Sequence, residues 1–538
     1  MPPQRGRDAL REALRARGFT PGRSETDAVV ELLADPDEAV AREAERALAR
    51  MGPALLTHLM SRAADGEAKV RAGTYRVAGR LAPQGEAEAT WLIRGLEDPD
   101  PRARRHAANA LGKLQDSSAA RAIEDALLAA WDRSPSADMQ RAIAASLGKL
   151  GSTRAVERLQ TAASQDSTLS QAAGRAALTI ARESTRGEES TIDPGRTPAE
   201  PTSIVFRCRA GLERIVAEEA RLACPALLHV DPPRRGEGRV FARLRGSLNE
   251  LFRVRTATTF AIALPGVPLD GDSANGLAAA LGSEEARRAL ETWTVGTVRY
   301  RIAWAQGGHR RAATWRAAQT IATRHPAWVN DPTASTWEVV AREEGGRLQV
   351  ELSPRSLDDP RFAYRVRDVP AASHPALAAA LVRAAGPRDD DVVWDPFMGS
   401  GVELVERARA GPYARLFGSD TNPRALDAAR ANFAAANLHG VQIDLADALA
   451  HSPPRTTLIL TNPPMGRRLV RDGSLATLLD RFIDHVSAVL AEDGRLVWLS
   501  PLGTRTSERA TLRGLKVTLE EVVDMGGFPA HLQRIVRR

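Results

Sequence analysis

The sequence has 538 residues, of which 43% are apolar and 26% are charged, a composition typical of folded globular domains. This length is sufficient for three or four domains. No apolar run approaches the roughly 20 residues that a membrane span needs, and residues 1–19 contain no apolar block typical of a secretory signal, so we expect a cytoplasmic protein. The two cysteines, Cys208 and Cys224, cannot form a disulfide framework or a four-thiolate site, and we expect no metal.

The net charge of +7 is distributed unevenly along the chain. Residues 1–200 contain 29 basic and 29 acidic side chains, whereas residues 201–538 contain 45 and 38. This excess is compatible with a nucleic-acid substrate for the C-terminal part. Only four of the 74 basic residues are lysine, however, and a coding bias toward arginine is an equally good explanation.

Residues 26–184 contain a repeated pattern. Segments starting at Asp35, Asp65 and Asp98 each have a small or apolar residue five positions later and an apolar residue sixteen positions later. Ala, Val and Leu recur between them at spacings of three and four, which predicts amphipathic helices, and the Asp-Pro or Asp-Gly pairs are typical of helix caps. Weaker copies farther along extend the pattern to about five helical hairpins of 30 to 36 residues.

Single hairpins of this kind cannot bury their apolar faces alone, whereas stacked hairpins can. The Asp-Pro turns and the closing Leu-Gly-x-Leu motifs, at 111–114 and 147–150, resemble those of HEAT repeats. The resemblance implies an all-α HEAT solenoid over residues 1–184 that binds a protein partner.

The segment 185–202 is polar and rich in Pro and Gly, which predicts an interdomain linker. Beyond it, short strand-like runs alternate with amphipathic helices, and Gly345-Gly346 predicts a hairpin turn. The region 203–368 is therefore predicted to be α+β. The predicted strands are 204–208, 240–244, 298–302, 336–340 and 348–352, and the predicted helices are 212–224 and 315–322.

A basic cluster within this region lies next to an aromatic residue. Arg310 and Arg311 precede Trp315 by a few positions. Basic residues beside aromatic ones suit RNA, because they contact phosphates and stack on bases. A charged surface loop beside a buried tryptophan gives the same pattern, so both interpretations stay open.

The strongest motif is VVWDPFMGSG at 392–401. It predicts a buried strand that ends in Asp395 and a glycine turn, followed by a helix over 402–410. Glycines let backbone approach a ligand where a Cβ would collide, and doubly wound sheets bind ligands at the carboxyl ends of their strands. The run 389–391, three aspartates, predicts a solvated turn before the strand.

Three further predicted strands end in polar residues. Asp420 lies nineteen residues after Gly401, where an acidic side chain can accept two hydrogen bonds from a ribose diol. The glycine turn lacks the GxGxxG form that a dinucleotide requires, and Asp395 would repel a pyrophosphate. A zwitterionic nucleoside without phosphates fits better, because its amino group can pair with Asp395. The strands and the residues after them are 414–418 with Asp420, 441–446 with Asp447, and 457–461 with Asn462, Pro463 and Pro464.

This order of motifs resembles that of class I S-adenosylmethionine-dependent methyltransferases, which implies an α/β Rossmann-like domain over residues 369–538 and S-adenosyl-L-methionine as cofactor. In that family Asp395, Gly399 and Gly401 would contact the methionine part of the cofactor. Asp420 would bind the ribose, and Asp447 the adenine amine. The whole implied cofactor set is Asp395, Pro396, Phe397, Gly399, Ser400, Gly401, Asp420 and Asp447.

The Asn462-Pro463-Pro464 segment resembles the tetrapeptide that holds an exocyclic amine in these enzymes. Such an amine is a poor nucleophile because its lone pair is delocalised into the ring. The Asn462 side-chain oxygen and the Pro463 carbonyl can accept its two hydrogens, and positioning then provides most of the rate. Met465 stands where the family usually has Tyr or Phe to stack on the base, and it is predicted to contact the substrate.

Residues 206–219 and 352–385 resemble the opening and the domain junction of THUMP-containing RNA guanine methyltransferases, which implies a ferredoxin-like and THUMP-like RNA-binding region over 203–368. Arg467, Arg310 and Arg311 are then candidates for RNA contact. Glu406 matches an acidic position of the family on the helix after the glycine turn.

The sequence thus predicts a multidomain enzyme that methylates the exocyclic amine of guanine in tRNA or rRNA, with a HEAT array for protein interaction and no membrane association. Two alternatives remain: a DNA amino-methyltransferase, which would normally keep the aromatic residue at position 465, and a non-catalytic scaffold with a degenerate methyltransferase fold.

Overall fold

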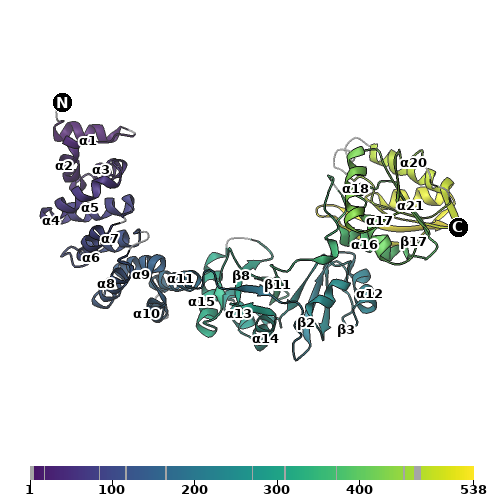
Figure 1. Ribbon diagram of the computed structural model, residues 1–538, viewed down its shortest axis with the longest axis horizontal. Coiled ribbons are helices and arrows are strands. Elements are labelled where there is room, and N and C mark those ends of the chain that lie inside the picture. The colour runs from purple at the N-terminus through teal and green to yellow at the C-terminus, as the bar shows by residue number, and fades with distance from the viewer. Residues whose placement is uncertain are drawn as a thin grey trace. The chain divides into compact units, whose positions relative to one another are not determined.

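The computed structural model folds into two compact units (Figure 1). The first comprises Met1–Ser190, Pro268–Gly282 and Gly296–Ser335, and the second comprises Thr191–Val267, Ser283–Val295 and Thr336–Arg538. No helix among the described residues is both long and apolar enough to cross a membrane. The structure describes residues 5–16, 18–83, 85–114, 118–163, 167–269, 271–307, 310–370, 372–451, 453, 455–465 and 474–538.

The first unit begins with an array of helical hairpins built on one continuous apolar core that runs from Leu10 to Ile180. Aspartates cap its helices as expected: Asp37 accepts a hydrogen bond from the backbone N–H of Ala39 at 2.8 Å, and Asp100 accepts from those of Arg102 and Ala103. The helices are α1 (Arg7–Arg15), α2 (Thr26–Glu31), α3 (Glu38–Arg50), α4 (Leu56–Asp65), α5 (Ala68–Leu81), α6 (Glu86–Gly95), α7 (Pro101–Leu111), α8 (Ala120–Arg133), α9 (Ala137–Leu150), α10 (Thr153–Ala163) and α11 (Ser167–Ser184).

The array continues into a small α/β segment of the same unit. It contains α13 (Ser273–Leu281), β8 (Arg299–Trp304), α15 (Arg311–Arg324) and β9 (Val329–Asn330). Helix α15 lies against α11, where the Gln319 side chain donates a hydrogen bond to the carbonyl of Ser170 at 3.2 Å. The start of the expected linker is also held here, because Arg299 donates to the hydroxyl of Thr185 at 3.0 Å.

The second unit contains an antiparallel run of strands in the order β3-β4-β2-β5-β11-β10. The final pair forms the hairpin predicted at Gly345 and Gly346, whose φ angles of 56° and 71° favour glycine. The elements are β2 (Thr202–Arg207), α12 (Glu213–Ala223), β3 (Leu227–Val230), β4 (Arg239–Leu244), β5 (Thr259–Ala263), α14 (Glu284–Trp293), β10 (Trp337–Glu344) and β11 (Arg347–Pro354).

The C-terminal part of this unit is a seven-stranded sheet in the order β14-β13-β12-β15-β16-β18-β17. The first five strands of this order are parallel to one another, and β18 and β17 add antiparallel pairs. Separate apolar cores lie on the two faces. The elements are α16 (Pro375–Ala385), β12 (Val392–Asp395), α17 (Val402–Arg409), β13 (Arg415–Asp420), α18 (Pro423–Ala435), β14 (Gln442–Leu445), β15 (Thr456–Thr461), α20 (Ser474–Val489), β16 (Leu490–Ser500), α21 (Gly503–Leu512), β17 (Leu515–Asp524) and β18 (Pro529–Arg537).

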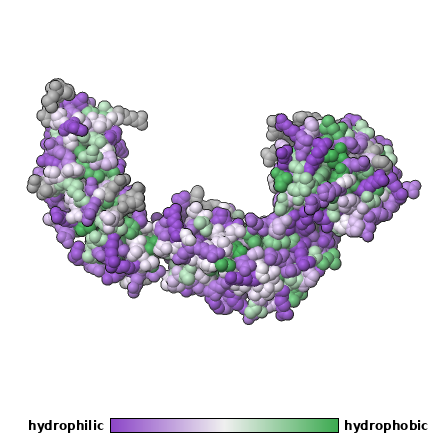
Figure 2. Space-filling view, viewed as in Figure 1, coloured by the Kyte–Doolittle hydropathy of each residue, from purple (hydrophilic) through white to green (hydrophobic). Residues whose placement is uncertain are grey.

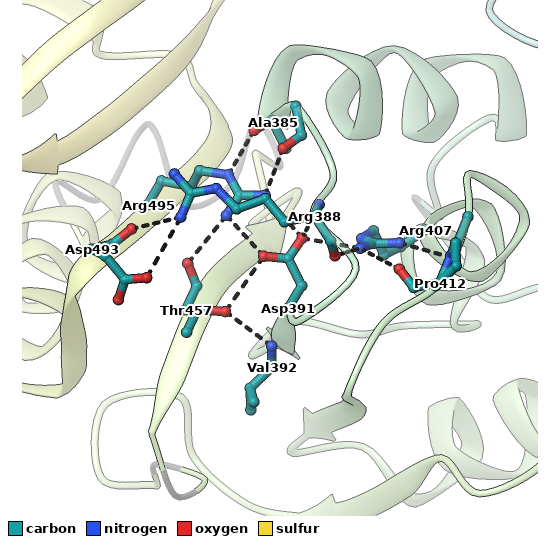
Figure 3. A network of polar contacts seen from close by, with 11 residues as sticks. Ala385, Arg388, Asp391, Val392, Arg407, Pro412, Thr457, Asp493 and Arg495 are labelled. Atoms are coloured by element: carbon teal, nitrogen blue, oxygen red, sulfur yellow. Dashed lines mark hydrogen bonds and ion pairs between the residues drawn. The ribbon is translucent and has the colours of Figure 1, made fainter.

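The start of β12 is anchored by a buried ionic network (Figure 3). Asp391 is fully buried and accepts hydrogen bonds from Arg495 at 2.9 Å and from Arg407 at 3.0 Å. Burial alone would raise the pKa of Asp391, but the hydrogen bond from Arg495 and the other donors lower it below its usual value. The solvated turn expected at 389–391 is therefore wrong for Asp391, although Asp389 and Asp390 are exposed.

Candidate active site

A cavity of about 530 Å³ lies at the carboxyl ends of the parallel strands β12, β13 and β15 and beyond the end of β14. Its volume is in the usual range for a small-molecule site, and its place is where open α/β sheets bind ligands. Residues predicted at the ends of four different strands therefore lie around one cavity. Eight predicted site residues contribute to its lining: Pro396, Phe397, Gly399, Ser400, Asp420, Asp447, Asn462 and Pro464.

Asp395, the last residue of β12, is fully buried behind this lining. Its Oδ1 atom accepts hydrogen bonds from the hydroxyl of Thr461 at 2.6 Å and from the backbone N–H of Phe397 at 3.2 Å. Its Oδ2 atom has no hydrogen-bond partner among the residues that the structure describes. An orphaned buried carboxylate oxygen is costly, so it indicates a site that is completed by a polar or cationic ligand group.

A second buried acid, Glu403, lines the cavity from the first turn of α17. Burial raises the pKa of Asp395 strongly, and the negative charge of Glu403 raises it further. Burial also raises the pKa of Glu403, against a hydrogen bond from Ser373. A cationic group bound beside these two acids would favour their ionised forms and offset this effect. Glu403 was not predicted as a site residue, although its place two residues after Gly401, the last glycine of the turn, could have indicated it.

The two glycines of the turn have different roles. Gly399 has φ +53° and lies on the cavity lining, where its backbone N–H donates to the Oδ2 of Asp420 at 2.9 Å. Gly401 has φ +78°, and a Cβ there would lie 2.5 Å from the ring of Phe433. Gly401 is not on the lining, and its missing side chain makes room for the ring of Phe433.

The carboxylates predicted for the ribose and the adenine amine lie on the lining after β13 and β14. Asp420 is partly buried, and its Oδ1 accepts from the backbone N–H of Asn422 at 2.8 Å. Asp447 is exposed and accepts from the N–H of Leu449 at 2.9 Å. Each carboxylate is thereby oriented by the backbone and retains lone pairs for a ligand.

Asn462 follows β15 and has its amide oriented by a chain of side chains. Its Nδ2 donates to the hydroxyl of Ser373 at 2.8 Å, and this hydroxyl in turn donates to Glu403. The Oδ1 of Asn462 is buried and has no hydrogen-bond partner within the described part of the chain. The amide nitrogen is thus engaged while the amide oxygen stays available as an acceptor. Ser373 was not predicted as a site residue, because no motif in the sequence around it indicates a functional role.

The remaining predicted residues lie in varied positions. Pro463 is buried, and Met465 is half-buried and packs against the apolar core on one face of the sheet. Glu406 is not on the lining, because it accepts from Arg255 at 2.8 Å and from the hydroxyl of Tyr364 at 2.6 Å. Arg467 lies outside the described residues.

Arg310 and Arg311 belong to the first unit and border a separate cavity of about 320 Å³. The guanidinium of Arg310 lies 4.8 Å from the ring centroid of Trp304, and that of Arg175 lies 5.4 Å from the ring of Trp315. Basic and aromatic side chains therefore do meet here through cation–π contacts, but Arg310 pairs with Trp304, and Trp315 pairs with Arg175.

Comparison with known proteins gives the class to which these features correspond. Residues 363–529 match the methyltransferase domain of the RMKL-like type, and residues 54–133 and 89–179 match HEAT repeats. The chain therefore has HEAT repeats in its helical N-terminal region and a C-terminal α/β domain of the methyltransferase-like fold. Both coarse predictions from the sequence are confirmed.

Individual relatives share parts of the chain. A tRNA (guanine(6)-N2)-methyltransferase of Thermus thermophilus is 34% identical over 195 residues, 35% of this chain and 56% of that protein. A tRNA (guanine(10)-N2)-dimethyltransferase of Methanothermobacter thermautotrophicus is 28% identical over 150 residues, 27% of this chain and 44% of that protein. The chain thus spans about half the length of the curated relatives it matches.

A solved structure agrees with the fold. The crystal structure of TrmN from Thermus thermophilus aligns with a TM-score of 0.52 at 24% identity, and the alignment covers 63% of this chain and 100% of that one. The similarity extends well beyond the C-terminal domain, because residues 363–529 are only 167 of the 538.

Proposed function

We propose that this protein is an S-adenosylmethionine-dependent methyltransferase that modifies the exocyclic N2 amine of guanine in RNA, with tRNA as the substrate class. The observation that carries the proposal is the Asn462 amide, whose Oδ1 is buried without a partner while its Nδ2 is engaged by Ser373. This acceptor lies in the same cavity as the carboxylates at the strand ends.

The residues of the cavity fit the proposed methyl donor. The unpartnered Oδ2 of Asp395 and the neighbouring carboxyl of Glu403 suit an ammonium group, and Asp420 presents a fixed carboxylate for a diol. Pro396, Phe397, Gly399, Ser400, Gly401 and Asp447 complete the set that we expect around it. When bound, the donor supplies a methyl group on a sulfonium sulfur.

Asn462 would position the acceptor amine. Its Oδ1 accepts one amine hydrogen, and the carbonyl of Pro463 accepts the other, so that the nitrogen lone pair is directed out of the ring plane. The rings of Pro463 and Pro464 fix the φ angles of these two residues and so stiffen the loop. No strong base is required for attack, so positioning and electrostatics are the main contributions of the protein.

An RNA substrate is supported by the names of the two relatives, which both act on guanine N2 in tRNA. We infer that the target base is unpaired or flipped to enter the cavity, with Met465 covering one face of it. The region 203–368 is proposed to be ferredoxin-like and THUMP-like and to bind RNA by shape, assisted by Arg310, Arg311 and Arg467.

The test is transfer of radiolabelled methyl from S-adenosylmethionine to unmodified tRNA, followed by nucleoside digestion. We expect label in N2-methylguanosine. Asn462→Ala should lower the transfer rate by about 10²–10³-fold, the size typical for loss of one positioned polar group in an active site. Donor binding, measured by calorimetry, should stay within twofold. Label in another nucleoside, or full activity of Asn462→Ala, would contradict the proposal.

A further inference from the structure

The second helices of the array hairpins, α3, α5, α7, α9 and α11, present the same surface position in successive repeats. Each of the first four segments has a basic residue ten positions after its first buried apolar residue. These residues are Arg50 in α3, Arg80 in α5, Lys113 two residues beyond the end of α7, and Lys149 in α9. All four are exposed. We call them the basic ladder.

Glycines bring the rungs of this ladder close together. Gly79, Gly112 and Gly148 immediately precede three of the rungs. A Cβ at Gly112 would lie 2.5 Å from the hydroxyl oxygen of Ser146, and one at Gly148 would lie 3.0 Å from the Cα of Ala176. The helices therefore meet at these positions, and successive basic side chains extend from neighbouring points of one surface.

Charge on this surface is segregated and not merely abundant. Residues 1–200 are neutral overall. Each of the five second-helix segments has a ladder position and two further positions, four and eight residues before it. Of the fifteen residues at these positions, ten are basic and none is acidic. All but Ala72 are at least partly exposed. The fifteen are Arg42, Arg46, Arg50, Ala72, Arg76, Arg80, Arg105, Asn109, Lys113, Arg141, Ala145, Lys149, Gln171, Arg175 and Thr179.

Six of these ten basic residues have an acidic partner within 4.0 Å, namely Arg42, Arg46, Arg76, Arg80, Arg105 and Arg141. The first helices of the hairpins are ion-paired as well. Their arginines form ion pairs between successive hairpins, as Arg154 does with Asp125 at 2.9 Å and Arg133 with Glu97 at 3.7 Å. Within the described part of the chain, Arg80 is the only rung with a carboxylate oxygen within 4.0 Å. Burial lowers the pKa of Lys149, and the nearby charge of Lys113 lowers it further. Lys113 and Lys149 are thus like charges that adjoin each other, and neither has an ion-pair partner among the residues that the structure describes.

We propose that the basic ladder binds the phosphate backbone of RNA. A row of exposed cations on a regular scaffold complements a polyanion, and it provides affinity without reading sequence. Protein interfaces instead rely on large apolar or aromatic anchors, and every exposed large hydrophobic side chain among the described residues lies outside the array. The inference rests on the proposed function for the choice of RNA as the polyanion.

The test compares two full-length variants with the same change of charge. R80Q/K113Q/K149Q removes three rungs, and R133Q/R154Q/R158Q removes three paired arginines from the first helices. Binding to fluorescently labelled unmodified tRNA is measured by anisotropy over a salt titration. We expect the Kd of the ladder variant to rise at least tenfold at low salt. The slope of log K against log salt should become shallower by about two, since each phosphate contact adds about 0.7–0.9.

The control variant should bind within about twofold of the unmodified protein. All three proteins should melt at the same temperature by circular dichroism, because all six substituted side chains are exposed. Equal loss of affinity in both variants, or unchanged binding by the ladder variant, overturns the proposal. Normal tRNA binding with lost binding to a polyglutamate probe also overturns it, in favour of an acidic protein partner. Absence of methyl transfer by the unmodified protein would count against the proposed function only, since the ladder is judged by binding.

Discussion

The helical array and the C-terminal sheet build their surfaces in different ways. In the array each hairpin packs against the hairpins before and after it in the sequence. One repeated residue position therefore becomes a row on the surface, as in the basic ladder. In the sheet the cavity is lined by residues from Val369 to Leu478, and most of them meet because parallel strands end at one edge. Changes in the array should therefore have local effects, whereas changes in the sheet should affect a distant site.

The largest expected effect is on the stability of the sheet. Asp391→Ala leaves Arg407 and Arg495 buried without their shared carboxylate, and it should lower the free energy of unfolding by about 3–5 kcal/mol. Chemical denaturation, with hydrogen exchange of the β12 and β16 amides to localise the loss, measures this. Asp390→Ala is the matched control, because Asp390 is exposed and should change stability by less than about 0.5 kcal/mol. Similar behaviour of the two variants would show that the network does not anchor the sheet.

The matching test in the array uses Gly79 and Gly112, which each immediately precede a residue of the basic ladder. Gly112→Ala places a Cβ against Ser146 and should cost about 1–3 kcal/mol. In Gly79→Ala the new Cβ would lie 3.5 Å from the Cα of Ala110, an ordinary van der Waals contact. This variant should therefore be neutral or stabilising by up to about 1 kcal/mol. Hydrogen exchange of α7 and α9 should report faster opening in the first variant only, with donor binding unchanged in both. A loss of donor binding in Gly112→Ala would contradict the expected independence of the two regions.

A smaller effect is expected where the sheet orients the loop that begins at Asn462. Ser373→Ala removes the acceptor of the Asn462 Nδ2 hydrogen bond, so the amide can rotate and present either end. We expect kcat to fall about tenfold, as for the loss of one hydrogen bond of about 1.4 kcal/mol. Ser373→Thr keeps the hydroxyl and should restore most of the rate. Failure of the threonine variant to restore kcat, with donor affinity normal, would argue that packing and not the hydroxyl is important.

The smallest effect concerns pH. A carboxyl whose pKa is higher in the folded chain than its unfolded value of about 3.9 adds stability below that value, and the contribution is lost as pH rises through the folded pKa. Asp395 is such a group. Without donor, the melting temperature of the unmodified protein should therefore fall relative to that of Asp395→Asn as pH increases. Scanning fluorimetry over a pH series measures this gap, and a gap independent of pH would mean that Asp395 does not titrate there.

Sequence patterns predicted the features that depend on local spacing. The helical hairpins, the order of strand ends and the loop beginning at Asn462 follow from periodicities of 3.6 and 2 and from residues at fixed offsets. Residue pairs distant in sequence were not accessible in this way. The partner of Asp391 is Arg495, 104 residues later, and the neighbour that requires Gly401 is Phe433. The role of Ser373 could not be predicted, because it exists only when the segment before α16 meets Asn462 and Glu403.

The central claim is that the acceptor is the exocyclic amine of guanine, held by Asn462. The most direct measurement compares two tRNA transcripts in the same methyl-transfer assay, one made with guanosine and one with inosine at the labelled position. Inosine differs from guanosine only in lacking the 2-amino group. The account predicts label in the guanosine transcript and none at that position in the inosine transcript. Equal labelling of both would show that the methyl group goes to another atom and would contradict the assignment of Asn462.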